Sequence, residues 1–66
     1  MAVAKVIEIT AASSESFEEA IKQGIAKAGE SVRNIKGAWV KEQKVKVDDG
    51  QISEYRVDLK VTFVLE

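Results

Sequence analysis

The chain has 66 residues, a formal net charge of -1 at pH 7, and neither cysteine nor histidine. A protein this short builds a thin core and usually needs a disulfide, a metal ion or a partner subunit for stability. The composition excludes a disulfide and removes the commonest transition-metal ligands, while the small net charge argues against nucleic-acid and anionic-membrane partners. We therefore expect one domain, residues 1–66, that gains further burial by self-association.

The first predicted strand covers residues 2–10 and is followed by a short polar connection, residues 11–15. A capping box then predicts the start of a helix, because Ser16 can accept a hydrogen bond from the amide of Glu19 and Glu19 can reach back to the amide of Ser16. The helix is expected over residues 17–32. Apolar or small residues recur along it at helical spacing and form its buried stripe: Phe17, Ala20, Ile21, Gly24, Ile25, Ala28 and Val32.

Residues 35–66 are predicted to form a long hairpin around Asp49-Gly50, a pair that favours a two-residue turn. The last strand alternates apolar and polar residues, which gives the sheet an apolar face and a polar face. The polar face also carries Trp39, Val45 and Val47 in this register. A turn closed by Asp48 and Gln51 predicts these cross-strand pairs: Ala38–Val61, Trp39–Lys60, Val40–Leu59, Lys41–Asp58 and Gln43–Arg56.

These elements predict an α+β fold of order β-α-β-β, with a three-stranded antiparallel sheet in strand order 1-3-2 wrapped on one helix. The helix is expected to cover the apolar face of the last strand. It is about 24 Å long, whereas a strand over residues 35–47 is about 43 Å long. The end of the hairpin, with Val45, Val47, Ile52 and, at its inner limit, Tyr55, therefore projects beyond the helix, and a second copy of the chain is expected to cover it.

No catalytic constellation is visible in the sequence. The serines near the helix start have no histidine to activate them, and no spacing of oxygen ligands resembles a calcium loop. We expect neither catalytic residues nor a metal site within one chain, and therefore a protein that is not an enzyme. The sequence has no apolar run of about 18 residues and no signal-peptide pattern, which predicts a soluble, cytoplasmic protein.

The order and spacing of these features resemble the dodecins over nearly the whole chain. The resemblance rests on residues 5–9 (KVIEI), 13–20 (SSESFEEA), 40–43 (VKEQ) and 54–63 (EYRVDLKVTF). It implies a hollow homododecamer and a non-enzymatic role in binding or storing a small ligand. Flavins, either FMN or riboflavin, are the leading ligands because many dodecins hold paired flavins between tryptophans.

The resemblance also places the expected flavin contacts on particular residues. The stacking tryptophan of the family falls on Gly37, the ring-binding glutamine falls on Arg56, and Trp39 lies two residues farther along the same strand face. Two hypotheses follow: Trp39 has taken over flavin stacking, or this is a dodecin-like cage that has lost flavin and is structural or binds cations or other anionic ligands. Weaker candidates for ligand contacts are Lys41, Gln43 and Asp58.

Two of these residues have structural interpretations as well. Trp39 is either an aromatic platform for a flat ligand or an interface residue between subunits. Arg56 either holds a phosphate or carboxylate, or pairs with an acidic residue of a neighbouring subunit.

Overall fold

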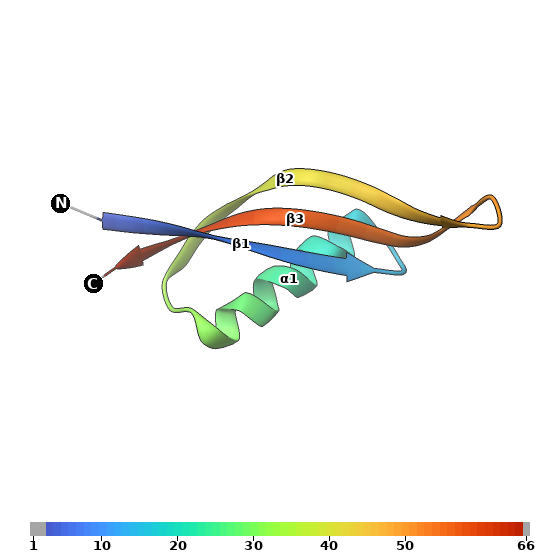
Figure 1. Cartoon of the computed structure of the whole chain (residues 1–66). Coiled ribbons are helices and arrows are strands. Elements are labelled where there is room, and N and C mark those ends of the chain that lie inside the picture. Colours follow the sequence, from blue (N-terminus) through green and yellow to red (C-terminus); the bar gives the residue numbers. More distant parts are fainter. Residues whose placement is uncertain (1–2, 66) are drawn as a thin grey trace.

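The computed structural model describes residues 3–65 and confirms the predicted β-α-β-β fold (Figure 1). The sheet has the strand order β1-β3-β2, and both neighbouring pairs are antiparallel. No helix within residues 3–65 is long and apolar enough to cross a membrane. The elements are β1 (Val3–Ser13), α1 (Phe17–Ser31), β2 (Ile35–Asp48) and β3 (Gln51–Leu65).

Strand β1 is longer than the sequence suggested. The predicted connection began at residue 11, but Ala11, Ala12 and Ser13 continue the ladder opposite β3. Alanine and serine have weak strand propensity, and here the unpaired backbone of the long central strand β3 overrides it. The predicted first residue of the strand, Ala2, lies outside the described residues.

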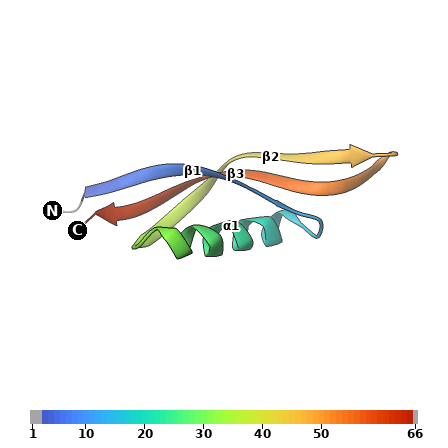
Figure 2. The same cartoon turned by 60° about the horizontal axis from the view of Figure 1, so that its bottom comes forward.

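Helix α1 begins at the predicted cap. The hydroxyl oxygen of Ser16 accepts a hydrogen bond from the backbone N–H of Glu19 at 3.0 Å. The carboxylate of Glu19 accepts from the side-chain amide of Gln23 (3.1 Å), one turn farther on, instead of making the predicted bond back to Ser16. The helix ends at Ser31, where Val32 takes an extended conformation, and it covers one face of the sheet as predicted (Figure 2).

The core lies between α1 and the centre of the sheet. Only four apolar residues of the described chain are fully buried there, namely Ala20, Val57, Leu59 and Val61. The helix approaches β1 closely at Gly24, where an added Cβ atom would lie 2.9 Å from the Cβ of Ala11. The predicted stripe of apolar and small residues on the helix therefore faces the sheet, but the core of a single subunit remains thin.

The hairpin turn forms as predicted, with left-handed backbone at Asp49 (φ 53°) and Gly50 (φ 75°). The predicted pairs Ala38–Val61, Trp39–Lys60 and Val40–Leu59 are confirmed. The predicted pairs Lys41–Asp58 and Gln43–Arg56 are wrong, because Asp58 pairs with Glu42 and Val57 pairs with Gln43.

Two bulges cause this difference. Ser53 is an extra residue on β3 and Lys41 is an extra residue on β2, so the register shifts by one between them and then returns. The hydroxyl of Ser53 donates to the carbonyl of Lys46 (3.2 Å) at the first bulge. Val45 pairs with Tyr55 and therefore lies on the helix side of the sheet, not on the polar face as predicted. By alternation Val47 lies there too.

The hairpin projects well beyond the helix, as Figures 1 and 2 show. The subunit is 51 Å long but only 19 and 14 Å across. The helix covers the hairpin only as far as Tyr55, whose ring packs edge-on against Phe17 at the start of the helix, with centroids 5.1 Å apart. Beyond this contact, Val47 is 60% exposed and Ile52 is 50% exposed.

Candidate functional site

The candidate site lies on the face of the sheet opposite α1, which we call the open face. Val61 and Leu59 point into the core, so Lys60 and Thr62 alternate onto the open face. Directly paired residues share a face, which places Trp39 (opposite Lys60) and Gly37 (opposite Thr62) there as well. The predicted arrangement of Trp39 and Gly37 on one strand face is therefore confirmed.

Trp39 is the main apolar feature of this face. The residue is 52% exposed, although proteins usually cover most of a tryptophan. Next to it, a Cβ atom built on Gly37 would meet no atom within 4 Å. The strand thus presents an aromatic ring beside a site with free space, and both are accessible in the single subunit.

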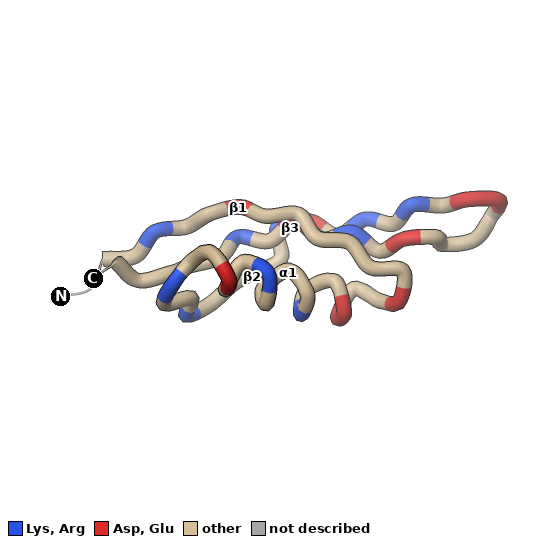
Figure 3. Tube along the Cα trace, turned by 90° about the horizontal axis from the view of Figure 1, so that it is seen from below, with Lys and Arg blue, Asp and Glu red and all other residues tan. Residues whose placement is uncertain are grey.

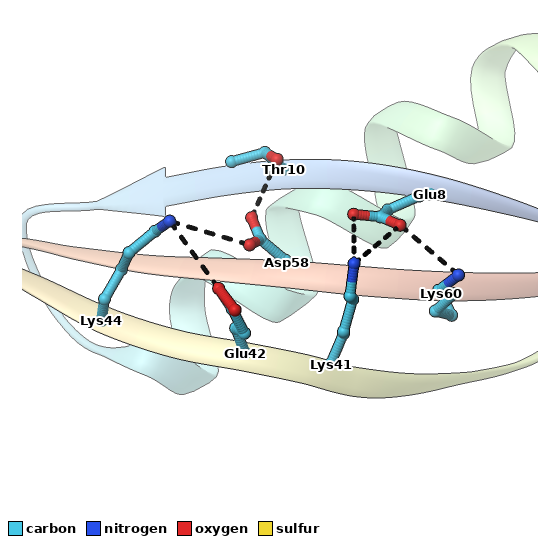
Figure 4. Close-up of polar contacts among 7 residues, drawn as sticks. All are labelled: Glu8, Thr10, Lys41, Glu42, Lys44, Asp58 and Lys60. Carbon is cyan, nitrogen blue, oxygen red and sulfur yellow. Dashed lines mark hydrogen bonds and ion pairs between the residues drawn. The ribbon is translucent and has the colours of Figure 1, made fainter.

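Charged side chains on the same face form a network of ion pairs across the three strands (Figure 4). Glu8 on β1 contacts both Lys41 and Lys60, each at 3.4 Å. Lys41, predicted to pair with Asp58, instead reaches across β3 to Glu8, because the bulge moves it out of register with Asp58. Trp39 therefore lies directly opposite a lysine that is held by a carboxylate.

Asp58 is held by other partners. Its carboxylate accepts a hydrogen bond from the hydroxyl of Thr10 (2.9 Å) and lies 3.8 Å from the amine of Lys44, which also contacts Glu42 at 3.9 Å. The Asp58 side chain is only 14% exposed. Because these contacts within the sheet already engage the Asp58 carboxylate, it has little capacity left to bind a ligand.

Arg56 and Gln43 lie on opposite faces of the sheet. Arg56 lies on the open face and contacts Glu54 on its own strand at 2.8 Å. Gln43 pairs with Val57, a core residue, and so lies on the helix side, away from Trp39. Of the six predicted ligand contacts the structure therefore brings five to the open face, Gly37, Trp39, Lys41, Arg56 and Asp58, and leaves Gln43 out.

These five do not converge on one point within a single chain. Lys60, opposite Trp39, is four residues from Arg56 along β3, a separation of about 13 Å at 3.3 Å per residue. A ligand stacked on Trp39 and bound by an arginine would take that arginine from another subunit or extend along the strand.

Sequence reasoning missed Glu8, Thr10, Glu42 and Lys44 as constituents of this face. The signal for the first two was present, since Glu8 and Thr10 alternate with the apolar Ile7 and Ile9 and so must lie on the face opposite the core. Glu42 and Lys44 reach the open face only because of the bulge at Lys41. No group of three or more acidic residues within residues 3–65 is arranged to hold a metal ion.

Comparisons with known proteins agree with this architecture. A family model described as Dodecin matches residues 3–66. A protein named calcium dodecin from Mycobacterium tuberculosis is 40% identical over 63 residues, which is 96% of this chain and 89% of that protein. A protein named dodecin from Thermus thermophilus is 34% identical over 64 residues, covering 97% of this chain and 93% of its own length.

Solved structures show the same fold. Dodecin from Streptomyces davaonensis superposes with a TM-score of 0.93 at 32% identity, covering 98% of this chain and 96% of that one. The crystal structure of the calcium dodecin, described as having a novel calcium-binding site, superposes with a TM-score of 0.83 at 40% identity, covering 97% and 91%.

Proposed function

Because this chain belongs to the dodecin family, we propose that it is a non-enzymatic binding or storage protein that assembles into a hollow homododecamer and holds a flat aromatic ligand on its open face. FMN and riboflavin are the leading ligands. The proposal rests on one observation above all, the half-exposed ring of Trp39 beside the free space at Gly37.

The chemistry of the open face suits such a ligand. An indole ring stacks on a flat π-system, and stacking of this kind contributes about 0.5–1.5 kcal/mol beyond area burial. Gly37 would leave space for the edge of the ligand. Lys41 and Lys60, which share the single carboxylate of Glu8, lie on the same face and would offer N–H donors to ring carbonyls. Arg56 is the candidate for a phosphate, because its planar fork matches phosphate oxygens.

A titration of FMN with the ligand-free protein tests this proposal. Stacking on Trp39 should quench flavin fluorescence in a saturable way, with about one flavin per subunit. Trp39→Ala should abolish the quenching, and Trp39→Phe should retain part of it because a smaller ring still stacks. Lys22→Ala, on the exposed helix surface, is the matched control and should bind like the parent chain. Unchanged FMN affinity in Trp39→Ala would exclude Trp39 from the site.

Gly37→Trp tests the same site in the opposite direction. A Cβ atom at Gly37 would meet nothing within 4 Å on this open face, so a tryptophan there should be accommodated in the subunit and should strengthen flavin binding. A variant that assembles normally but gains no affinity for FMN would show that the ligand does not lie over this position.

A second candidate function is a dodecin-like cage that binds cations or other anionic ligands in place of flavin. It is favoured by Gly37 and Arg56 at the two expected flavin contacts, and by the relative that is named calcium dodecin. Under this hypothesis FMN causes no quenching. Calcium or inorganic phosphate then gives measurable heat in isothermal titration calorimetry, and Arg56→Gln weakens the phosphate signal without affecting calcium.

A further inference from the structure

The ion pairs of Glu8 leave an uncompensated positive charge on the open face. The single carboxylate of Glu8 contacts two ammonium groups, those of Lys41 and Lys60, each at 3.4 Å. Within residues 3–65 neither lysine contacts a second carboxylate. Two positive charges against one negative charge give these three side chains a net charge of +1.

This charge lies beside the ring that is proposed to bind the ligand. Glu8, Lys60 and Trp39 stand in one row across the three strands. The Cβ atoms of directly opposite residues, such as Lys60 and Trp39, are about 4.5–5.5 Å apart. Lys41 follows Trp39 by two residues on β2, and its amine reaches across β3 to the same carboxylate (Figure 4). One carboxylate thus holds both ammonium groups in place next to the tryptophan.

The row on the other side of Trp39 contains no charged residue. It consists of Val6 on β1, Thr62 on β3 and Gly37 on β2. A ligand that stacks on Trp39 and extends over Gly37 would therefore have an uncharged surface under one end and the two lysines at the other.

The basic character is local and does not extend over the whole open face. Basic and acidic residues both occur along the hairpin, as the tube in Figure 3 shows. In the row beyond Lys60, the carboxylates of Asp58 and Glu42 share the amine of Lys44, at 3.8 and 3.9 Å, which leaves one negative charge there. That row is about 7 Å farther along the strands, on the side away from Gly37. The positive end of the network is therefore the end next to the ligand.

From this arrangement we propose that the open face selects flat aromatic ligands whose ring system itself carries a negative charge. Lys41 and Lys60 attract the anionic ring, and Glu8 is the positioning residue that holds them. The inference rests on the flavin site proposed above and adds the charge of the ring to its specificity. Two unit charges about 6 Å apart, at a dielectric constant between those of water and a protein surface, favour an anionic ring over a neutral one by about tenfold.

Riboflavin is a suitable probe, because its ring changes charge on reduction and it has no phosphate that could bind Arg56. At pH 8 the oxidised ring is neutral, and uptake of two electrons and one proton gives a reduced ring with one negative charge. Tenfold tighter binding of the reduced form would raise the two-electron reduction potential of bound riboflavin by about 30 mV relative to free riboflavin. Anaerobic titration with dithionite, followed by absorbance against a reference dye, measures this difference.

Two charge variants should shift the potential in opposite directions. Glu8→Gln leaves both lysines without their carboxylate and should raise the potential by roughly another 30 mV. Lys60→Gln removes the excess charge and should return the potential to that of free riboflavin. A merely structural disturbance of the site would move both variants in the same direction. Lys22→Gln, on the exposed helix surface, changes the net charge as Lys60→Gln does and should leave the potential unaltered.

The outcomes separate the charge selection from the flavin site itself. A bound potential equal to or below that of free riboflavin would overturn the selection and leave the flavin site standing. A raised potential that neither Glu8→Gln nor Lys60→Gln shifts would also overturn it, because the preference would then come from other groups. If the parent chain binds riboflavin in neither form, the selection and the proposed flavin function are both overturned.

Discussion

The inner and outer halves of the β2–β3 hairpin share an alternating pattern but differ in what covers them. In the inner half, Leu59 and Val61 are almost completely inaccessible to solvent beneath α1. In the outer half, Val47 and Ile52 are half or more exposed, although they too lie on the helix side. The alternation of apolar and polar residues therefore determines which face of a strand needs to be buried. The length of the helix determines how much of that face the same subunit can bury.

The largest expected effect on stability comes from a substitution in the inner half of the hairpin. Leu59→Ala should lower the free energy of unfolding by about 2–5 kcal/mol, since it leaves a cavity in a core with few other members. Urea denaturation at one fixed protein concentration measures it.

Val47→Ala is the matched change in the outer half. It should cost much less at low protein concentration, and its cost should grow with concentration if another subunit covers the residue. Equal costs for the two variants at all concentrations would remove the distinction between the halves.

A smaller effect concerns the close contact of the helix with β1. Gly24→Ala should lower the free energy of unfolding by about 1–2 kcal/mol, because its Cβ atom would lie 2.9 Å from the rigid Cβ of Ala11. Gly29→Ala is the control in the same helix. It meets nothing within 4 Å and should raise the free energy of unfolding by about 0.5–1 kcal/mol. A gain in stability from both substitutions would mean that the helix does not pack so tightly.

Loss of the helix cap is expected to cost about 1 kcal/mol. Ser16→Ala removes the acceptor for the N–H of Glu19, while Ser16→Asn should largely preserve it. Circular dichroism during thermal unfolding would show the difference between the two variants. Ser16→Ala with an unchanged melting temperature would show that water satisfies this N–H equally well.

The smallest effect is expected on the open face. Glu8→Gln removes the charge that Lys41 and Lys60 share, yet the three side chains are partly exposed and the change should cost only a few tenths of a kcal/mol. The difference should diminish further in high salt, as urea denaturation with and without 1 M sodium chloride would show. A loss comparable to that of Leu59→Ala would mean that this network of ion pairs, and not the apolar core, holds the sheet together.

Much of the fold could be predicted from the sequence because it depends on local signals. Three of these signals each act over a few residues: the cap at Ser16, the apolar stripe of the helix and the turn at Asp49-Gly50. The apolar alternation of β3 in turn predicted that it is the central strand. The end of β1 could not be predicted in this way, because Ala11 and Ala12 are strand residues only through their pairing with β3.

The bulge at Lys41 explains the errors on the candidate site. It moved Gln43 and Val45 to the helix side and gave Lys41 a different ionic partner. A signal for it was present in the sequence, because Ala38 and Val40 alternate on even positions whereas Val45 and Val47 alternate on odd ones. A change of phase between them requires an extra residue. The second bulge, at Ser53 near the turn, restores the register, but it could not be predicted from the sequence. A polar residue can lie on either face of the sheet there.

The two bulges also bear on how the length of this chain can change in evolution. Lys41 and Ser53 each stand opposite no partner, so removal of either one leaves every other pair in the hairpin intact. Removal of a residue between them would turn the rest of that strand to the opposite face unless a bulge were gained or lost in compensation. Single-residue gaps between this hairpin and those of related chains are therefore expected at these two positions, where the ladder absorbs them without exposing the core.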